Sequence, residues 1–113
     1  MALIPQNARA AAEQPFDAAT TMQTLDVGTT DTTFADLPAG AWEAFNTGSV
    51  HLVASLTGTT ASMPPSSGAA AVTAFPIPAG GVASFVLYET TTLHAKQISG
   101  SGTVALYLTR KVL

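Results

Sequence analysis

The chain has 113 residues, of which 47% are hydrophobic and 10% charged, with a formal net charge of −3 and no cysteine. This length fits one domain with a modest core, and the lack of cysteine excludes disulfides and cysteine-ligated zinc. Four lysines and arginines are too few for a nucleic acid or an anionic membrane surface, since both require clustered cations. No stretch approaches the ~20 apolar residues of a transmembrane helix.

Residues 1–20 differ in composition from the rest and are expected to form an N-terminal arm. The segment NARAAAEQP predicts a short helix over residues 8–14, capped by Asn7 and stopped by Pro15. So short a helix is not stable alone, so the arm is expected either to dock on something or to be mobile. The start lacks the basic and apolar regions of a signal peptide, so export by that route is not expected. The candidate neighbour-binding residues of the arm are Leu3, Ile4, Pro5, Arg9 and Phe16.

From residue 21 onward the pattern is that of β-strands. In VHLVASL, for example, Val50, Leu52 and Leu56 share one face and His51 shares the other with Val53. Short strands separated by Gly, Pro, Asn and Ser turns favour an all-β domain over residues 21–113, an antiparallel β-sandwich or a jelly-roll-like barrel. The predicted strands are Met22–Val27, Ala41–Asn46, Val50–Leu56, Val72–Phe75, Val82–Tyr88, Leu93–Ile98 and Thr103–Thr109.

Between Glu43 and Glu89 the sequence has no charged residue. Thr and Ser fill the solvated positions instead, which suits either a subunit interface or a neutral β surface. The long loop from Thr57 to Ala71 contains Pro64–Pro65, which cannot join a central ladder, so the loop is expected to lie outside the sheets.

Two phrases repeat, LPAGAWEAFN at residues 37–46 and IPAGGVASFVLY at residues 77–88. Each has a Pro-Ala-Gly turn followed by a strand with a phenylalanine, Phe45 or Phe85, at the same offset. The repeat predicts two similar hairpin units that face each other in the sandwich, with both phenylalanines in the core. The alternative is two copies of a binding site, although the repeated residues carry no chemistry.

The sequence offers weak candidates for metal sites. His51 and His94 are the only histidines, and neither has an evident partner to complete a metal site. The series Asp26, Asp31 and Asp36 has a spacing of five residues, which does not match a calcium loop. A solvated loop is the preferred interpretation, and no metal or other cofactor is expected.

Candidate catalytic and ligand-stacking residues are also few. Glu43 and Glu89 are the only candidates for a carboxylate pair, and no nucleophile motif appears, so the chain is not expected to be an enzyme. The aromatic residues that could stack on sugars are Trp42, Tyr88 and Tyr107, at least one of which is needed for the core. A glycan-binding module is therefore the main functional alternative.

Several phrases over residues 37–109 resemble small β-sandwich structural proteins of tailed bacteriophage virions. They are FNTGS, PIPAG, the F-x-L strand that follows, and LHAKQISGSGTVALYLT. The resemblance implies a capsid decoration (cement) protein, located in the virion and made in the host cytoplasm, or a component of a head fibre or tail. Such proteins are often homotrimers, and the implied partners are the major capsid protein or other virion proteins. The arm would then bind the capsid or an adjacent subunit.

Overall fold

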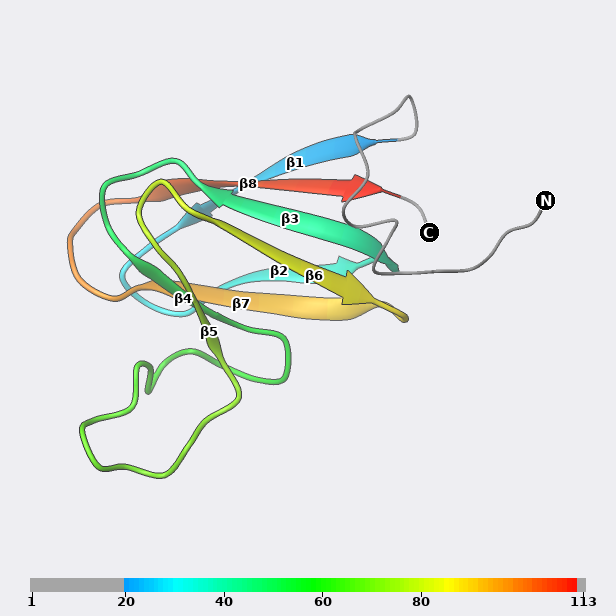
Figure 1. Ribbon diagram of the computed structural model, residues 1–113. Coiled ribbons are helices and arrows are strands. Elements are labelled where there is room, and N and C mark those ends of the chain that lie inside the picture. Colours follow the sequence, from blue (N-terminus) through cyan, green and yellow to red (C-terminus); the bar gives the residue numbers. More distant parts are fainter. Residues whose placement is uncertain (1–19, 112–113) are drawn as a thin grey trace.

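The computed structural model describes residues 20–111, which contain eight strands and no helix (Figure 1). The strands are β1 (Thr21–Val27), β2 (Thr32–Leu37), β3 (Gly40–Asn46), β4 (Leu52–Ser55), β5 (Phe75–Ile77), β6 (Val82–Leu87), β7 (Thr91–Gln97) and β8 (Val104–Lys111).

The strands form two four-stranded antiparallel sheets. Sheet A has the order β1-β8-β3-β6, and sheet B has the order β2-β7-β4-β5. This is the strand order of an eight-stranded jelly roll, in which the chain crosses between two packed sheets at every connection except that from β4 to β5. The predicted all-β class with a sandwich or jelly-roll architecture is confirmed.

The core fills the space between the sheets. Each strand sends alternate side chains inward, so Leu106 and Leu108 of β8 meet Leu52 of β4 and Leu93 of β7 in one cluster. Trp42, on β3, is also completely buried there, and its indole N–H donates to the carbonyl of Pro38 at 3.0 Å. Each large apolar side chain buried in this way stabilises the fold by roughly 1.5–3 kcal/mol.

Two buried amides lie at one end of the core, where the chain crosses between the sheets. Asn46 donates to the carbonyls of Val50 (2.8 Å) and Ile77 (3.0 Å) and accepts from the backbone N–H of Gly48 (3.0 Å). The side-chain amide of Gln97 donates to the carbonyl of Val27, at the end of β1, and to that of Gly102 in the β7–β8 loop, at 3.0 and 2.9 Å. A buried polar group needs such partners, because an unsatisfied one costs about 1–3 kcal/mol.

All seven predicted strands have counterparts, but one strand was not predicted. The polar sequence of β2, TTFADL, gives little alternation, and an irregularity of register between Phe34 and Leu37 interrupts it. Asp36, with φ of 60°, lies within that irregularity. The predicted strand at residues 72–75 also begins later, as the three-residue β5.

The repeated phrases do not form two hairpins, so that expectation is corrected. The turn after Asn46 connects β3 of sheet A to β4 of sheet B, and the turn after β6 likewise leads to β7 in the other sheet. Instead, β3 pairs with β6 and β4 pairs with β7, so the two repeats lie beside each other strand by strand.

The phenylalanines of the two phrases also point in opposite directions. Gly40 is already part of β3, whereas Gly80 belongs to a turn closed by the N–H of Gly81 and the carbonyl of Pro78 at 2.8 Å. The strands therefore begin at different offsets, and Trp42 lies opposite Phe85. Inward-facing side chains are even-numbered in β3, as in Trp42 and Ala44, but odd-numbered in β6, as in Phe85 and Leu87. Equivalent positions of the two phrases, forty residues apart, therefore lie on opposite faces of sheet A. Phe85 packs against the core as predicted, but the core prediction for Phe45, which is 40% exposed, is wrong.

Candidate functional site

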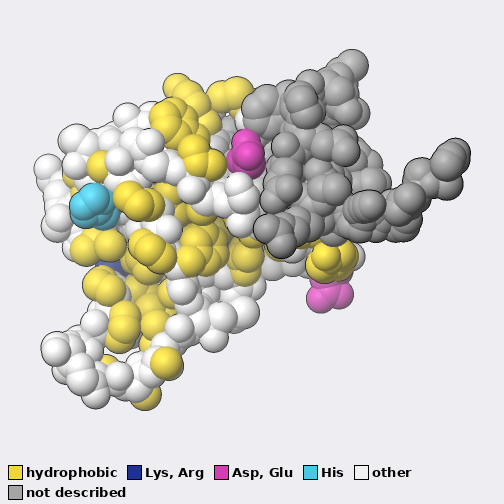
Figure 2. Space-filling view, in the orientation of Figure 1, with side chains coloured by type: hydrophobic (Ala, Val, Ile, Leu, Met, Phe, Trp, Pro, Cys, Tyr) yellow, Lys and Arg dark blue, Asp and Glu magenta, His cyan; other side chains and the backbone are white. Residues whose placement is uncertain are grey.

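The outer face of sheet A carries a group of exposed hydrophobic side chains. Tyr107, Phe45 and Val82 lie directly opposite one another on β8, β3 and β6, and Met22 lies on the same face of β1. We call these four residues the apolar strip. Their exposed fractions are 37% for Tyr107, 40% for Phe45, 54% for Val82 and 57% for Met22. Figure 2 looks onto part of this face and shows hydrophobic side chains over β3, β6 and β8.

Phe45 and Tyr107 form the centre of the strip. Their ring centroids are 6.4 Å apart and the rings are tilted by 58°, a favourable arrangement for an aromatic pair. Two rings that hold each other in place form a rigid surface, so little side-chain entropy is lost when a partner binds.

The charges on this face have one sign. Glu43 lies on the outer side of β3 and Asp26 on the outer side of β1. Lys111 also belongs to the outer row but is only 7% exposed, and the described residues place no exposed lysine or arginine on the face. Apolar surface beside two carboxylates suits a protein partner with apolar side chains and a few cations.

The outer face of sheet B is different, because part of the β4–β5 loop folds against it. Lys96 of β7 donates to the carbonyl of Ala61 at 3.0 Å, and Ser55 of β4 donates to the carbonyl of Thr73 at 3.0 Å. Val53, on the outer side of β4, is consequently buried. The rest of the loop projects below the sandwich (Figure 1).

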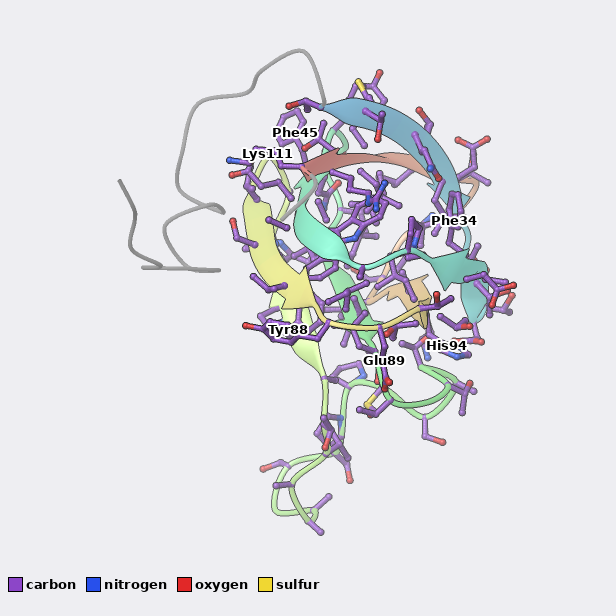
Figure 3. All side chains as sticks on the ribbon, turned by 90° about the vertical axis from the view of Figure 1, so that its right-hand side faces the viewer. Phe34, Phe45, Tyr88, Glu89, His94 and Lys111 are labelled. Carbon is purple, nitrogen blue, oxygen red and sulfur yellow. The ribbon has the colours of Figure 1, made fainter. Side chains whose placement is uncertain are left out.

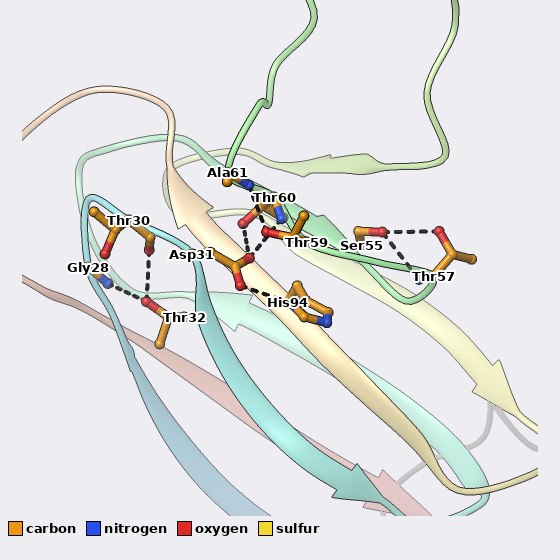
Figure 4. Close-up of polar contacts among 10 residues, drawn as sticks. All are labelled: Gly28, Thr30, Asp31, Thr32, Ser55, Thr57, Thr59, Thr60, Ala61 and His94. Atoms are coloured by element: carbon orange, nitrogen blue, oxygen red, sulfur yellow. Dashed lines mark hydrogen bonds and ion pairs between the residues drawn. The ribbon is translucent and has the colours of Figure 1, made fainter.

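Asp31 anchors this loop, as Figure 4 shows. One carboxylate oxygen accepts from the backbone N–H and the hydroxyl of Thr60, at 2.7 and 2.5 Å, and the other lies 3.0 Å from Nδ1 of His94. Burial raises the pKa of Asp31, but the hydrogen bonds from Thr60 and the contact with His94 outweigh it and lower the pKa to about 2. Thr60 itself is completely buried.

The histidines and aspartates that were candidate metal ligands instead occupy strands or hold loops by hydrogen bonds. His94 does have a carboxylate partner, Asp31, which the sequence interpretation missed, and His51 accepts from the backbone N–H of Ala79 at 3.0 Å. Asp26 lies opposite Ala105 in the ladder between β1 and β8, and Asp36 lies in the irregular part of β2. Within residues 20–111, no three His, Cys, Asp or Glu side chains come together as metal ligands would.

The two glutamates are not brought together. Glu43 lies opposite Ser84, whereas Glu89 lies beyond Leu87, the last residue of β6, which is itself about 10 Å along the strand from Ser84. A glycosidase pair requires a separation of roughly 5–10 Å. These residues therefore form no carboxylate pair.

The three aromatic stacking candidates occupy three separate environments. Trp42 is buried in the core and presents no face to solvent, so its stacking role is excluded by packing. Tyr107 belongs to the apolar strip. Tyr88 is 76% exposed beyond the end of β6, six positions from Val82, and Figure 3 shows it well away from Phe45. Tyr88 and Tyr107 therefore do not form a common platform.

The arm candidates lie outside the described residues: Leu3, Ile4, Pro5, Arg9 and Phe16. The sequence interpretation also missed Phe45 as a surface residue. A signal for it was available, because Trp42 and Phe45 are three positions apart and an odd offset places them on opposite faces of a strand. The larger, buried tryptophan thus directs the phenylalanine outward.

In the described part of the chain, no helix is long and apolar enough to span a membrane. No protein-family model matches the sequence, and no curated protein matches it. Among solved structures, a chain described under "Bacillus endospore appendages form a novel family of disulfide-linked pili" has a similar arrangement, with a TM-score of 0.46 and 14% identity over 83% of this chain and 86% of that chain. The present chain has no cysteine and so cannot form disulfide links.

Proposed function

We propose that this chain is a structural protein, not an enzyme, that binds other proteins in a large assembly. More specifically, we propose a decoration protein of a tailed bacteriophage capsid, acting as a homotrimer, made in the host cytoplasm and located in the virion. Its partner would be the major capsid protein or another virion protein. The observation that carries the proposal is the apolar strip on the outer face of sheet A.

The strip supports adhesion better than catalysis. Its four side chains are large, exposed and held on neighbouring strands of one sheet. Covering apolar surface contributes about 25 cal/mol per Å² before the cost of association is subtracted. A strip of this size therefore gives a weak single contact, and a symmetric oligomer on a repetitive shell would multiply it.

The test is cosedimentation of the purified full-length chain with empty shells of the phage that encodes it. We expect saturable binding at a fixed stoichiometry. Tyr107→Ser should weaken binding at least tenfold, because it removes one half of the central aromatic pair. Tyr88→Ser is the matched control, since it makes the same substitution at a tyrosine that is more exposed (76% against 37%) and lies outside the strip, and it should bind as the unmodified chain does.

Lack of shell binding would contradict the decoration role. If the chain instead bound a host polysaccharide and lost that binding with Tyr107→Ser, a glycan-binding role would replace it. Equal losses for the two tyrosine variants would contradict the assignment of the strip as the contact surface.

A further inference from the structure

The two sheets differ in how well their edge strands are protected against pairing with a further strand. In sheet B, β5 has only three residues, of which Pro76 is one, and β2 is interrupted between Phe34 and Leu37. In sheet A, the edge strands are β1 and β6, with sequences TMQTLDV and VASFVL. Neither contains a proline or a lysine, and Asp26 is their one charged residue. Natural sheets usually protect their edges with such devices, and only sheet B has them.

The hydrogen-bond pattern shows which groups of β6 face the open edge. The N–H of Asn46 donates to the carbonyl of Gly81 at 3.0 Å, so this pair is hydrogen-bonded between β3 and β6. Since bonded and non-bonded pairs alternate along antiparallel strands, Val82, Ser84 and Val86 direct their backbone groups away from β3. No strand in the described part of the chain pairs with that side of β6.

The same reasoning applies to β1. The N–H of Thr47 donates to the carbonyl of Ala105 at 3.2 Å, so the odd-numbered residues of β8 face β3 and the even-numbered ones face β1. Gln23 and Leu25 lie opposite even-numbered residues and bond to β8. Thr24, between them, therefore directs its backbone N–H and carbonyl to the side of β1 on which no strand of residues 20–111 pairs.

Pro76 shows how the protein itself closes an edge. The N–H of Ile98 donates to the carbonyl of His51 at 2.9 Å, and alternation from this pair makes Val53 bond toward β7. Pro76 lies opposite Val53, so its ring nitrogen faces the outer edge of β5. Proline has no N–H to offer a further strand, so this edge lacks a donor at its central position.

We propose that β6 of one copy pairs with β1 of a second copy, so that two A sheets join into one continuous sheet. Neighbouring strands of sheet A are all antiparallel, and β1 and β6 therefore run in opposite directions. A copy displaced sideways by four strand spacings, about 19 Å, places its β1 antiparallel to β6 of the first copy. The middles of the two strands, Thr24 and Ser84, are uncharged and exposed.

This arrangement goes beyond the proposed function, because it joins copies to each other whatever they bind. It also leaves the apolar strips of successive copies on the same side of the joined sheet. The interface uses two different surfaces, so it is heterologous and builds a ring where rotation closes it and a filament where it does not. In either case each strip becomes part of a multivalent surface.

The test transfers the proline of sheet B to sheet A. Thr24→Pro blocks the β1 edge, and Ser84→Pro blocks the β6 edge, while the ladders inside the sheet keep their hydrogen bonds because both N–H groups face outward. Thr24→Ala and Ser84→Ala are the controls. Mass is measured by light scattering on a sizing column over a range of concentrations, and the fold is checked by circular dichroism.

We expect the unmodified chain and both alanine variants to exceed the 11.5 kDa of a monomer at the higher concentrations. Each proline variant alone should be monomeric, because it retains only one of the two edges. An equimolar mixture of the two should form a dimer of twice the monomer mass and nothing larger, since one free β6 and one free β1 remain.

Three results would overturn the proposal: an unmodified chain that is monomeric at every concentration, a proline variant that dimerises alone, or a mixture that stays monomeric while each variant is folded. If proline prevents folding, Thr24→Lys and Ser84→Lys are used instead, and unchanged mass in both would overturn it equally. Shell binding by a folded monomeric variant would separate this inference from the proposed function, because the apolar strip remains intact.

Discussion

The outer faces of the two sheets differ in whether the chain itself covers them. Four large hydrophobic side chains are exposed on strands of sheet A, whereas among the described residues no strand of sheet B exposes one. The outer face of sheet B instead carries His94, Lys96 and Ser55, which are engaged with the chain's own loop and its anchor Asp31. One face is therefore completed within the chain, and the other is available to a partner.

This difference separates residues that stabilise the fold from residues available for function. Polar contacts on sheet B hold a loop in place, and their loss should lower the free energy of unfolding. The apolar strip on sheet A contributes little to the folded monomer, and its loss should act on assembly. Substitutions on the two faces should therefore affect different measurements.

On the face of sheet B, the largest effect on stability is expected for Asp31→Ala. It leaves the N–H and hydroxyl of the buried Thr60 without an acceptor and removes the partner of His94. Each unsatisfied buried group costs about 1–3 kcal/mol, so we expect the free energy of unfolding to fall by roughly 2–4 kcal/mol in urea titrations. Limited proteolysis should show new cuts within residues 57–71.

Asp31→Asn is the matched control for this prediction. Its amide oxygen still accepts from Thr60, so the loss should be about half as large and the loop should resist proteolysis better. Equal stability of the alanine variant and the unmodified chain would show that the loop is held by other contacts.

Acid should weaken the same anchor by a smaller amount. The pKa of Asp31 is about 2 in the folded chain, below its ordinary value near 3.8, so the unfolded chain binds the proton more readily. The stabilisation is complete above about pH 4 and is lost as the pH falls toward 2. After allowance for partial exposure we expect a loss of about 1–2 kcal/mol, measured as unfolding free energy at pH 5 and pH 2.5.

The Asp31→Ala variant serves as the control for the pH effect, because it lacks the titrating group. The difference in unfolding free energy between this variant and the unmodified chain should shrink as the pH falls. A difference that is the same at both pH values would contradict the role of the Asp31 carboxylate in anchoring the loop.

The sequence was sufficient for the fold class but not for the pairing of its strands. Alternation in segments such as Val50–Leu56 identifies strands locally, because the side-chain period of two is a property of each strand alone. Whether the strand after Asn46 pairs with its predecessor or crosses to the other sheet depends on contacts with strands far along the chain. The repeated Pro-Ala-Gly phrases contain no information on that choice, and they even begin their strands at different offsets.

The candidate surface was partly accessible from the sequence. The low charge between Glu43 and Glu89 indicated a neutral surface, and Tyr107 was identified as a candidate aromatic contact. Its partner Phe45 was assigned to the core, because the repeat with Phe85 suggested equivalent positions. The Asp31 anchor joins residues 29 and 63 positions apart, and no local pattern connects such distant polar side chains.

The smallest effect on stability, and a large one on assembly, is expected for Phe45→Ser. The side chain is on the solvent side of β3 and interacts mainly with Tyr107, so its loss should change the free energy of unfolding by no more than about 1 kcal/mol. Shell binding should fall at least tenfold, because the serine leaves a gap in the centre of the strip.

Phe85→Ser is the matched control, because it makes the same substitution at the equivalent position of the repeat. Its side chain lies on the inner face opposite Trp42, so the free energy of unfolding should fall by about 2–4 kcal/mol. If Phe45→Ser destabilised the chain as much as Phe85→Ser and left shell binding unchanged, the contrast between the completed face and the available face would be wrong.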